Sequence, residues 1–171
     1  MSKPQFTKVS NRDLETRVRE DDHTALRLWL KLLSTSQLIE NNVREQLRIK
    51  FDTTLPRFDL MAQLQRHPEG LSMSSLAELM MVSGGNITNI VKQLEAEGLV
   101  KRSPQEKDNR SFIVTLSDIG AQRFDKMRDA HEGWIVDLTN GVPVEEMLTL
   151  LNQLDVLKRA IKNNVERSST H

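Results

Sequence analysis

The stretch that decides the fold is Leu71–Gly120, which reads LSMSSLAELMMVSGGNITNIVKQLEAEGLVKRSPQEKDNRSFIVTLSDIG. Ser72 is a suitable N-cap residue, and the apolar residues that follow it on one helical face are Leu76, Leu79 and Met80. The stretch therefore begins with a short amphipathic helix. The residues after this helix predict a turn, a second helix and then two short strands.

The second helix is predicted to begin after Ser83 and to end at Gly98. Ser83 can cap its first turn, and Gly98 supplies a left-handed stop. Apolar residues recur at intervals of three and four on its inner face: Ile87, Ile90, Val91 and Leu94. The opposite face carries the polar residues Asn86, Thr88, Asn89, Lys92 and Gln93. Such side chains hydrogen-bond base edges or phosphates in a DNA major groove, so this segment is a candidate recognition helix.

Two glycines, Gly84 and Gly85, occupy the first turn of the candidate recognition helix. Each lowers helix stability by roughly 1 kcal/mol relative to alanine, but each also removes a side chain that would separate the backbone from a ligand. Close approach to a DNA phosphate is one interpretation. A simple turn between two core helices is the other.

Two short runs with alternating apolar residues follow, at Leu99–Pro104 and Ser111–Leu116, and they predict a β-hairpin. The polar loop between them contains Lys107, Asp108 and Arg110. Asp108 can hold the guanidinium of Arg110 extended by a charge-assisted pair, and an extended arginine can enter a DNA minor groove. A solvated ion pair is the alternative, although such pairs add only about 0–1 kcal/mol to stability.

Together these segments resemble the MarR (multiple antibiotic resistance regulator) family of winged helix-turn-helix transcription factors. The resemblance rests on Leu76–Met81, on MVSGGNITNIVKQLEAEGLVKR at 81–102, on Asp108-Asn109-Arg110 and on VTLSDIG at 114–120. It implies a mainly α fold with a small β-wing, in which a winged helix-turn-helix is flanked by N- and C-terminal dimerisation helices. The family usually has polar or bulky residues where Gly84 and Gly85 stand, which moves the expected side-chain readout toward Asn86, Thr88, Asn89 and Lys92.

We expect DNA contacts from the candidate recognition helix and the wing tip, at Ser83, Gly84, Gly85, Asn86, Thr88, Asn89, Lys92, Lys107, Asp108 and Arg110. The chain has 24 basic and 24 acidic residues, and its net charge of zero argues against a generally polybasic DNA binder. Five basic residues gather around these two elements: Lys92, Lys101, Arg102, Lys107 and Arg110. Because this local charge is modest, we expect two copies to bind one pseudo-palindromic duplex.

Three flanking segments are predicted to be helices. One runs from Asp21 or Asp22 to about Lys50, one extends from Ser117 to a break at Asn140–Pro143, and one follows that break. The last helix carries an apolar stripe formed by Met147, Leu150, Leu151, Leu154, Leu157, Ile161 and Val165. An intramolecular core is one use of such a stripe. The family resemblance implies another, in which both chain ends interleave with those of a second subunit.

We therefore expect a single MarR-type domain over residues 1–171. Its dimerisation segments lie at about 11–51 and 118–167, and its winged helix-turn-helix lies at about 54–117. A short helix over Thr53–Gln65 links these parts. No apolar run is long enough for a secretory signal or a membrane span, so we expect a cytoplasmic protein.

Catalytic chemistry has little support in the sequence. The chain has no cysteine, which excludes thiol-based redox sensing. The histidines lack the paired spacing of zinc motifs: His23, His67, His131 and His171. There is no glycine-rich phosphate loop, nucleophile elbow or HExxH motif. We therefore expect no enzyme, no cofactor and no metal.

The resemblance also implies a small-molecule effector, often an aromatic anion, bound between the dimerisation helices and the DNA reader. The candidate effector-binding residues are Trp29, Arg44, Arg48, Lys50, Arg57 and Phe58. Solvation of the cations and core packing of Trp29 are the alternatives. The segment LPRFD at 55–59, together with residues 80–90, is similar to the branch of the family that represses hydroxycinnamate catabolism and responds to aromatic acyl-CoA thioesters.

Two functions follow as hypotheses. The first is a homodimeric repressor of a catabolic operon that an aromatic carboxylate or its CoA thioester releases from DNA. The second is a winged-helix module that contacts proteins, which would suit the near-zero net charge. Steep salt dependence of binding would distinguish the first from the second.

Overall fold

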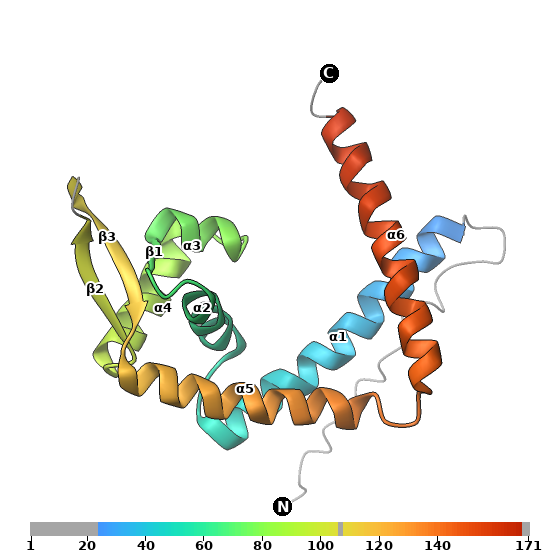
Figure 1. The fold of residues 1–171 in the computed structure, drawn as a ribbon, viewed down its shortest axis with the longest axis horizontal. Coiled ribbons are helices and arrows are strands. Elements are labelled where there is room, and N and C mark those ends of the chain that lie inside the picture. Colours follow the sequence, from blue (N-terminus) through green and yellow to red (C-terminus); the bar gives the residue numbers. More distant parts are fainter. Residues whose placement is uncertain (1–23, 106–107, 169–171) are drawn as a thin grey trace, which may run out of the picture. The chain divides into compact units, whose positions relative to one another are not determined.

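The computed structural model describes residues 24–105 and 108–168 (Figure 1). In chain order the elements are α1 (Thr24–Phe51), α2 (Leu55–Arg66), β1 (Leu71–Ser72), α3 (Met73–Leu79), α4 (Gly84–Ala96), β2 (Val100–Gln105), β3 (Asp108–Leu116), α5 (Asp118–Leu138) and α6 (Val144–Ser168). The described part of the chain divides between Gly133 and Trp134 into two compact units. The predicted mainly α fold with a small β-wing is confirmed.

A three-stranded antiparallel sheet forms the wing, with the strand order β1-β3-β2. The hairpin of β2 and β3 projects from the end of α4 and the start of α5 (Figure 1). Its strands run closer to the tip than predicted, because backbone pairing continues to Gln105 and Asp108 beyond an irregularity after Pro104. The predicted loop of six residues was therefore too long. Strand β1 was not predicted, because its two residues, paired with Val114 and Ile113, carry too short a pattern to recognise.

The helix caps agree with the sequence in part. Ser72 caps α3, because its Oγ accepts the backbone N–H of Ser75 at 3.0 Å. Ser83 occupies the N-cap position of α4, but its side chain makes no capping hydrogen bond, so that part of the prediction was wrong. Gly98 has φ +70°, which confirms the left-handed stop after α4.

The core of the first unit lies around α4. Its inner face is buried as predicted, through Ile87, Ile90, Val91 and Leu94. This face meets α2, α3 and β2, which contribute the buried residues Leu60, Leu64, Leu76 and Val100. Leu79 was predicted to share the inner face of α3 but is 45% exposed, because the short helix ends there and its last turn lies outside the core.

A tight junction ties the end of α4 to the start of α5. The Ser117 hydroxyl donates to the carbonyl oxygen of Gly98 at 2.6 Å and accepts the N–H of Gly120 at 2.9 Å, which confirms Ser117 as the cap of α5. A methyl group on Gly120 would lie only 1.9 Å from the carbonyl oxygen of Leu99. Only glycine therefore allows α5 to approach this backbone.

The second unit contains the end of α5 and all of α6. The break between the two helices falls where the sequence predicted it, at Gly141 with φ +95° and Pro143. No residue of α6 from Val144 to Ser168 is buried. Its predicted apolar stripe therefore lies on the surface of the single chain, at Leu150, Leu151, Leu154 and Ile161 among others. None of the described helices has the length and apolar character needed to cross a membrane.

Two glycines of α5 allow the junction to be tested. Gly120→Ala should lower the free energy of unfolding by about 2–3 kcal/mol, because the new methyl group overlaps the Leu99 carbonyl. Gly133→Ala should leave stability unchanged or raise it by up to about 1 kcal/mol, because nothing lies within 4 Å of the new methyl group. Urea unfolding at one protein concentration measures both. Equal stability of the two variants would contradict the assignment of the junction.

Candidate nucleic-acid interface and ligand pocket

The exposed side of α4 carries the polar residues predicted to read DNA. The exposed residues are Ser83, Gly84, Gly85, Asn86, Asn89 and Lys92. Thr88 is half-buried, and its hydroxyl donates to the carbonyl oxygen of Gly84 at 2.9 Å. Because that proton is used within the helix, Thr88 is left as a hydrogen-bond acceptor toward a ligand.

Gly84 and Gly85 are not required by the fold. A methyl group on either one would meet no atom within 4 Å, and neither residue has a positive φ. Packing and backbone conformation therefore do not explain why the first turn of α4 lacks side chains. What the two glycines provide is open space over the start of the helix, where backbone N–H groups can meet a phosphate.

The wing tip lies partly outside the described part of the chain. Lys107 is not among the described residues, and the side chains of Asp108 and Arg110 are not described either. The backbone of Asp108 pairs with that of Gln105, which places the start of β3 beside the tip. The proposed ion pair between Asp108 and Arg110 stays a prediction.

Two glutamates near α4 pair with arginines of the same chain. Glu95 lies 2.5 Å from Arg102 of β2, and the hydrogen bond from that guanidinium lowers the pKa of the Glu95 carboxyl. Arg102 also lies 5.7 Å from the ring centroid of Phe112. Glu97 lies 2.5 Å from Arg57 of α2. The sequence grouped Arg102 with the cations available to DNA, whereas the structure engages it with Glu95.

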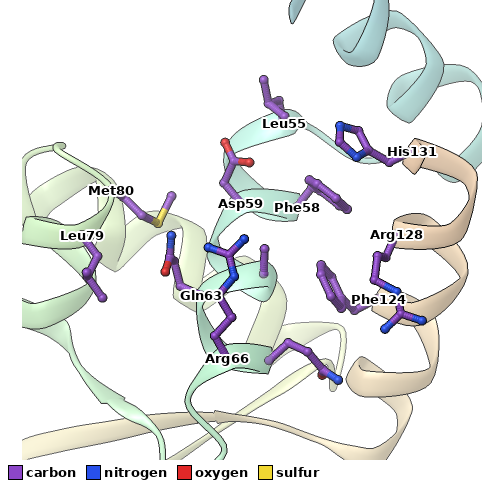
Figure 2. A pocket seen from close by; sticks show the side chains of 12 residues that line it. Leu55, Phe58, Asp59, Gln63, Arg66, Leu79, Met80, Phe124, Arg128 and His131 are labelled. Atoms are coloured by element: carbon purple, nitrogen blue, oxygen red, sulfur yellow. The ribbon is translucent and has the colours of Figure 1, made fainter. Parts of the chain in front are cut away.

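A cavity of about 570 Å³ lies in the first unit, lined by α2, the end of α3 and α5. Figure 2 shows α2 in the middle, with Leu79 and Met80 on one side and α5 on the other. The wall is aromatic where α2 meets α5, because the rings of Phe58 and Phe124 stack with centroids 5.4 Å apart. The ring of His131 lies 5.2 Å from that of Phe58. A flat apolar group would fit this wall.

Polar groups in the same cavity have altered proton affinities. Burial raises the pKa of Asp59, and repulsion from Glu40 adds to this effect while Arg44 opposes it. Burial lowers the pKa of His131, so its imidazole is neutral at pH 7. Two arginines also line the cavity. Arg128 pairs with Asp125 and Asp129, at 2.7 and 2.9 Å. The guanidinium of Arg66 points along α2 toward Asp59 (Figure 2).

The structure separates the six candidate effector-binding residues. Among them, Phe58 lines the 570 Å³ cavity. Arg48 and Arg57 line a second cavity of about 440 Å³, shared with Asp52, Thr53, Thr54, Glu97 and Arg123. Arg44 pairs with Glu40 along α1, Lys50 is exposed, and Trp29 is 56% exposed. The alternative that Trp29 packs in the core is therefore wrong for the single chain.

Sequence reasoning missed the part of the pocket that α5 supplies. Phe124, Arg128 and His131 follow one another at intervals of four and three, so they share one face of the helix. This spacing was visible in the sequence, but nothing there indicated which element the face would meet. Among the described residues, no group of three carboxylate, histidine or cysteine side chains is placed to hold a metal.

The fold and the exposed polar helix define a winged helix-turn-helix protein. The sequence profile of the MarR family matches residues 53–112. The chain is 31% identical over 139 residues to the uncharacterised HTH-type transcriptional regulator YfiV of Bacillus subtilis, covering 80% of this chain and 82% of that protein.

Solved structures agree with this match. A MarR family transcriptional regulator from Silicibacter pomeroyi has a TM-score of 0.70 and 30% identity, covering 80% of this chain and 94% of that one. A MarR family regulator from Streptomyces coelicolor, solved in complex with DNA, shares the fold with a TM-score of 0.68 at 18% identity, covering 83% and 92% of the two chains. The chain belongs to the MarR family of transcriptional regulators.

The open first turn of α4 gives a testable prediction. Gly84→Ala and Gly85→Ala should each stabilise the fold by up to about 1 kcal/mol, because alanine is the better helix former and nothing obstructs its methyl group. Both should nevertheless weaken DNA binding, because the methyl group holds the backbone away from a phosphate. Urea unfolding and fluorescence anisotropy with a duplex selected by the wild type from a randomised pool measure the two effects. Tighter or unchanged DNA binding would show that the glycines do not serve close approach.

Proposed function

We propose that this protein is a homodimeric DNA-binding repressor of a catabolic operon, released from its operator by a small aromatic carboxylate or the corresponding CoA thioester. One observation carries the DNA-binding part. The buried apolar face of α4 leaves Asn86, Asn89 and Lys92 exposed beside a wing. The DNA complex of the Streptomyces coelicolor relative, which shares the fold, supports this interpretation.

The homodimer is proposed from the apolar surfaces at both ends of the chain. Helix α6 buries none of its residues, and Leu150, Leu151 and Ile161 are more than half exposed. Helix α1 also exposes apolar side chains, because Leu28 is 45% and Leu38 62% exposed. A second copy of the chain would cover both surfaces. A symmetric dimer can present two α4 helices to successive major grooves about 34 Å apart.

The effector is proposed from the lining of the 570 Å³ cavity. An aromatic ring would pack on Phe58 and Phe124, and its carboxylate would face the guanidinium of Arg66. For a CoA thioester, the phosphates need further cations. The second cavity offers Arg48 and Arg123 in addition to Arg57, which is already paired with Glu97.

Release is proposed to act through the end of α3. Leu79 and Met80 line the effector cavity and directly precede the turn that leads into α4. A ligand that contacts Leu79 and Met80 favours one orientation of α3 and α4 over another. The ligand therefore weakens DNA binding only as far as it prefers the orientation that does not fit the operator.

The second candidate is the protein-interaction module, which the net charge of zero favours. The cytoplasmic location and the single domain over residues 1–171 remain predictions.

Salt dependence separates the two functions. A dimer with six to ten phosphate contacts should lose a factor of roughly 10³–10⁵ in DNA affinity between 50 and 200 mM salt.

Arg110→Ala should weaken binding to most sequences. The control Lys126→Ala removes one positive charge from the exposed side of α5 and should leave affinity unchanged. Anisotropy titrations measure affinity, and light scattering measures the mass of the free protein. Salt-independent binding would favour the protein-contact module, and a monomer with full DNA affinity would exclude the dimer.

The effector can be identified by thermal shift with hydroxycinnamates, benzoates and their CoA thioesters. A ligand at a hundred times its dissociation constant should stabilise the protein by about 2.7 kcal/mol. Ionised Asp59 repels a carboxylate, so affinity should rise as the pH falls through the raised pKa of Asp59. Asp59→Asn should remove that rise and leave only the rise from protonation of His131. If no compound shifts the melting temperature, the aromatic effector is excluded. The proposal that the protein binds DNA would still stand.

A further inference from the structure

Met81, in the turn between α3 and α4, has an unusual backbone for its residue type. Its φ is +53°, and its N–H donates to the carbonyl oxygen of Glu78 at 3.1 Å. The next N–H, that of Val82, donates to the carbonyl oxygen of Ala77, also at 3.1 Å. This pair of bonds is the Schellman ending of a helix, and Met81 stands at the left-handed position that glycine usually occupies. A side chain is disfavoured in this conformation.

The rest of the described chain follows the usual preference. Positive φ angles occur at Gly70, Gly98 and Gly141, which have no side chain, and at Asp52, whose residue type tolerates the conformation. Within residues 24–105 and 108–168, Met81 is the one bulky apolar residue with such a backbone.

Packing within the chain does not explain the methionine. Its side chain is 93% exposed, so the fold gains no burial in return for the disfavoured backbone. The neighbouring Leu79 and Met80 line the effector cavity, whereas Met81 does not. A disfavoured backbone that the fold does not need is a reason to look for a function at the surface.

We propose that Met81 is an additional DNA-contacting residue whose side chain packs against a thymine methyl group in the major groove. This inference rests on the proposed DNA binding through α4. Met81 lies two residues before the N-cap Ser83, next to the turn of Gly84 and Gly85 that carries no side chains. The occupant follows from chemistry, because the C5-methyl of thymine is the apolar group among the base edges of the major groove. A thioether side chain is flexible and polarisable, and it suits such a contact better than a contact with phosphate.

Removing the methyl group from DNA tests the contact directly. Duplexes recovered by the wild type from a randomised pool would be resynthesised with each thymine in turn replaced by deoxyuridine. At one thymine in each half-site, the replacement should weaken wild-type binding roughly fourfold, as expected for one buried methyl group. The same replacement should leave the affinity of Met81→Gly unchanged, because that variant has no side chain to make the contact.

Three variants separate the contact from the turn. Met81→Gly and Met81→Asn both suit a left-handed residue, so both should melt at a higher temperature than the wild type while losing the response to deoxyuridine. Met81→Leu keeps an apolar side chain and the strained backbone, so it should keep both the response and the wild-type melting temperature.

The outcomes are distinct. If Met81→Gly binds the selected duplexes as tightly as the wild type, or responds to every deoxyuridine as the wild type does, the proposed contact is overturned while DNA binding through α4 stands. If Met81→Gly changes the mass measured by light scattering, the side chain packs on a second copy and the proposal is also overturned. If selection recovers no duplex, the proposed function fails and this inference fails with it.

Discussion

Close approach of two backbones at the start of α5 sets the geometry on which the DNA reader depends. Gly120 leaves no room for a methyl group beside the Leu99 carbonyl, and Ser117 joins Gly98 to the first turn of α5 through its hydroxyl. The stop after α4, the first residues of β2 and the end of β3 therefore meet at one point. Because α5 also supplies Phe124 and His131 to the 570 Å³ cavity, the same contact fixes that wall relative to α4.

The local elements were largely predictable, because each depends on a short pattern. Alternating and helical periodicities located the hairpin and every long helix, and Gly98 marked the end of α4. The features that these patterns did not predict depend on contacts between distant segments of the chain. Strand β1 exists only because β3 pairs with it, and Leu79 is exposed although its spacing suits a core position. The α5 side of the cavity could not be placed for the same reason.

Ion pairs within the chain neutralise acidic side chains at the end of α4. Two carboxylates that would repel a phosphate, Glu95 and Glu97, are paired with Arg102 and Arg57. Lys92 and Lys101 remain exposed. Net charge counted over the sequence does not show where unpaired charges lie, because paired charges of opposite sign largely cancel at the distance of a ligand. The pairing itself depends on tertiary contacts and is not visible from composition.

The first turn of α2 contains two adjacent residues that face different neighbours. Arg57 pairs with Glu97 at the end of α4, and its Nε is buried without a hydrogen-bond partner. Phe58, the next residue, forms part of the aromatic wall. A rotation of α2 that improves stacking at Phe58 must also move the guanidinium held by Glu97. Any coupling that follows is reciprocal, so DNA would weaken the affinity for an effector by the same factor as the effector weakens the affinity for DNA.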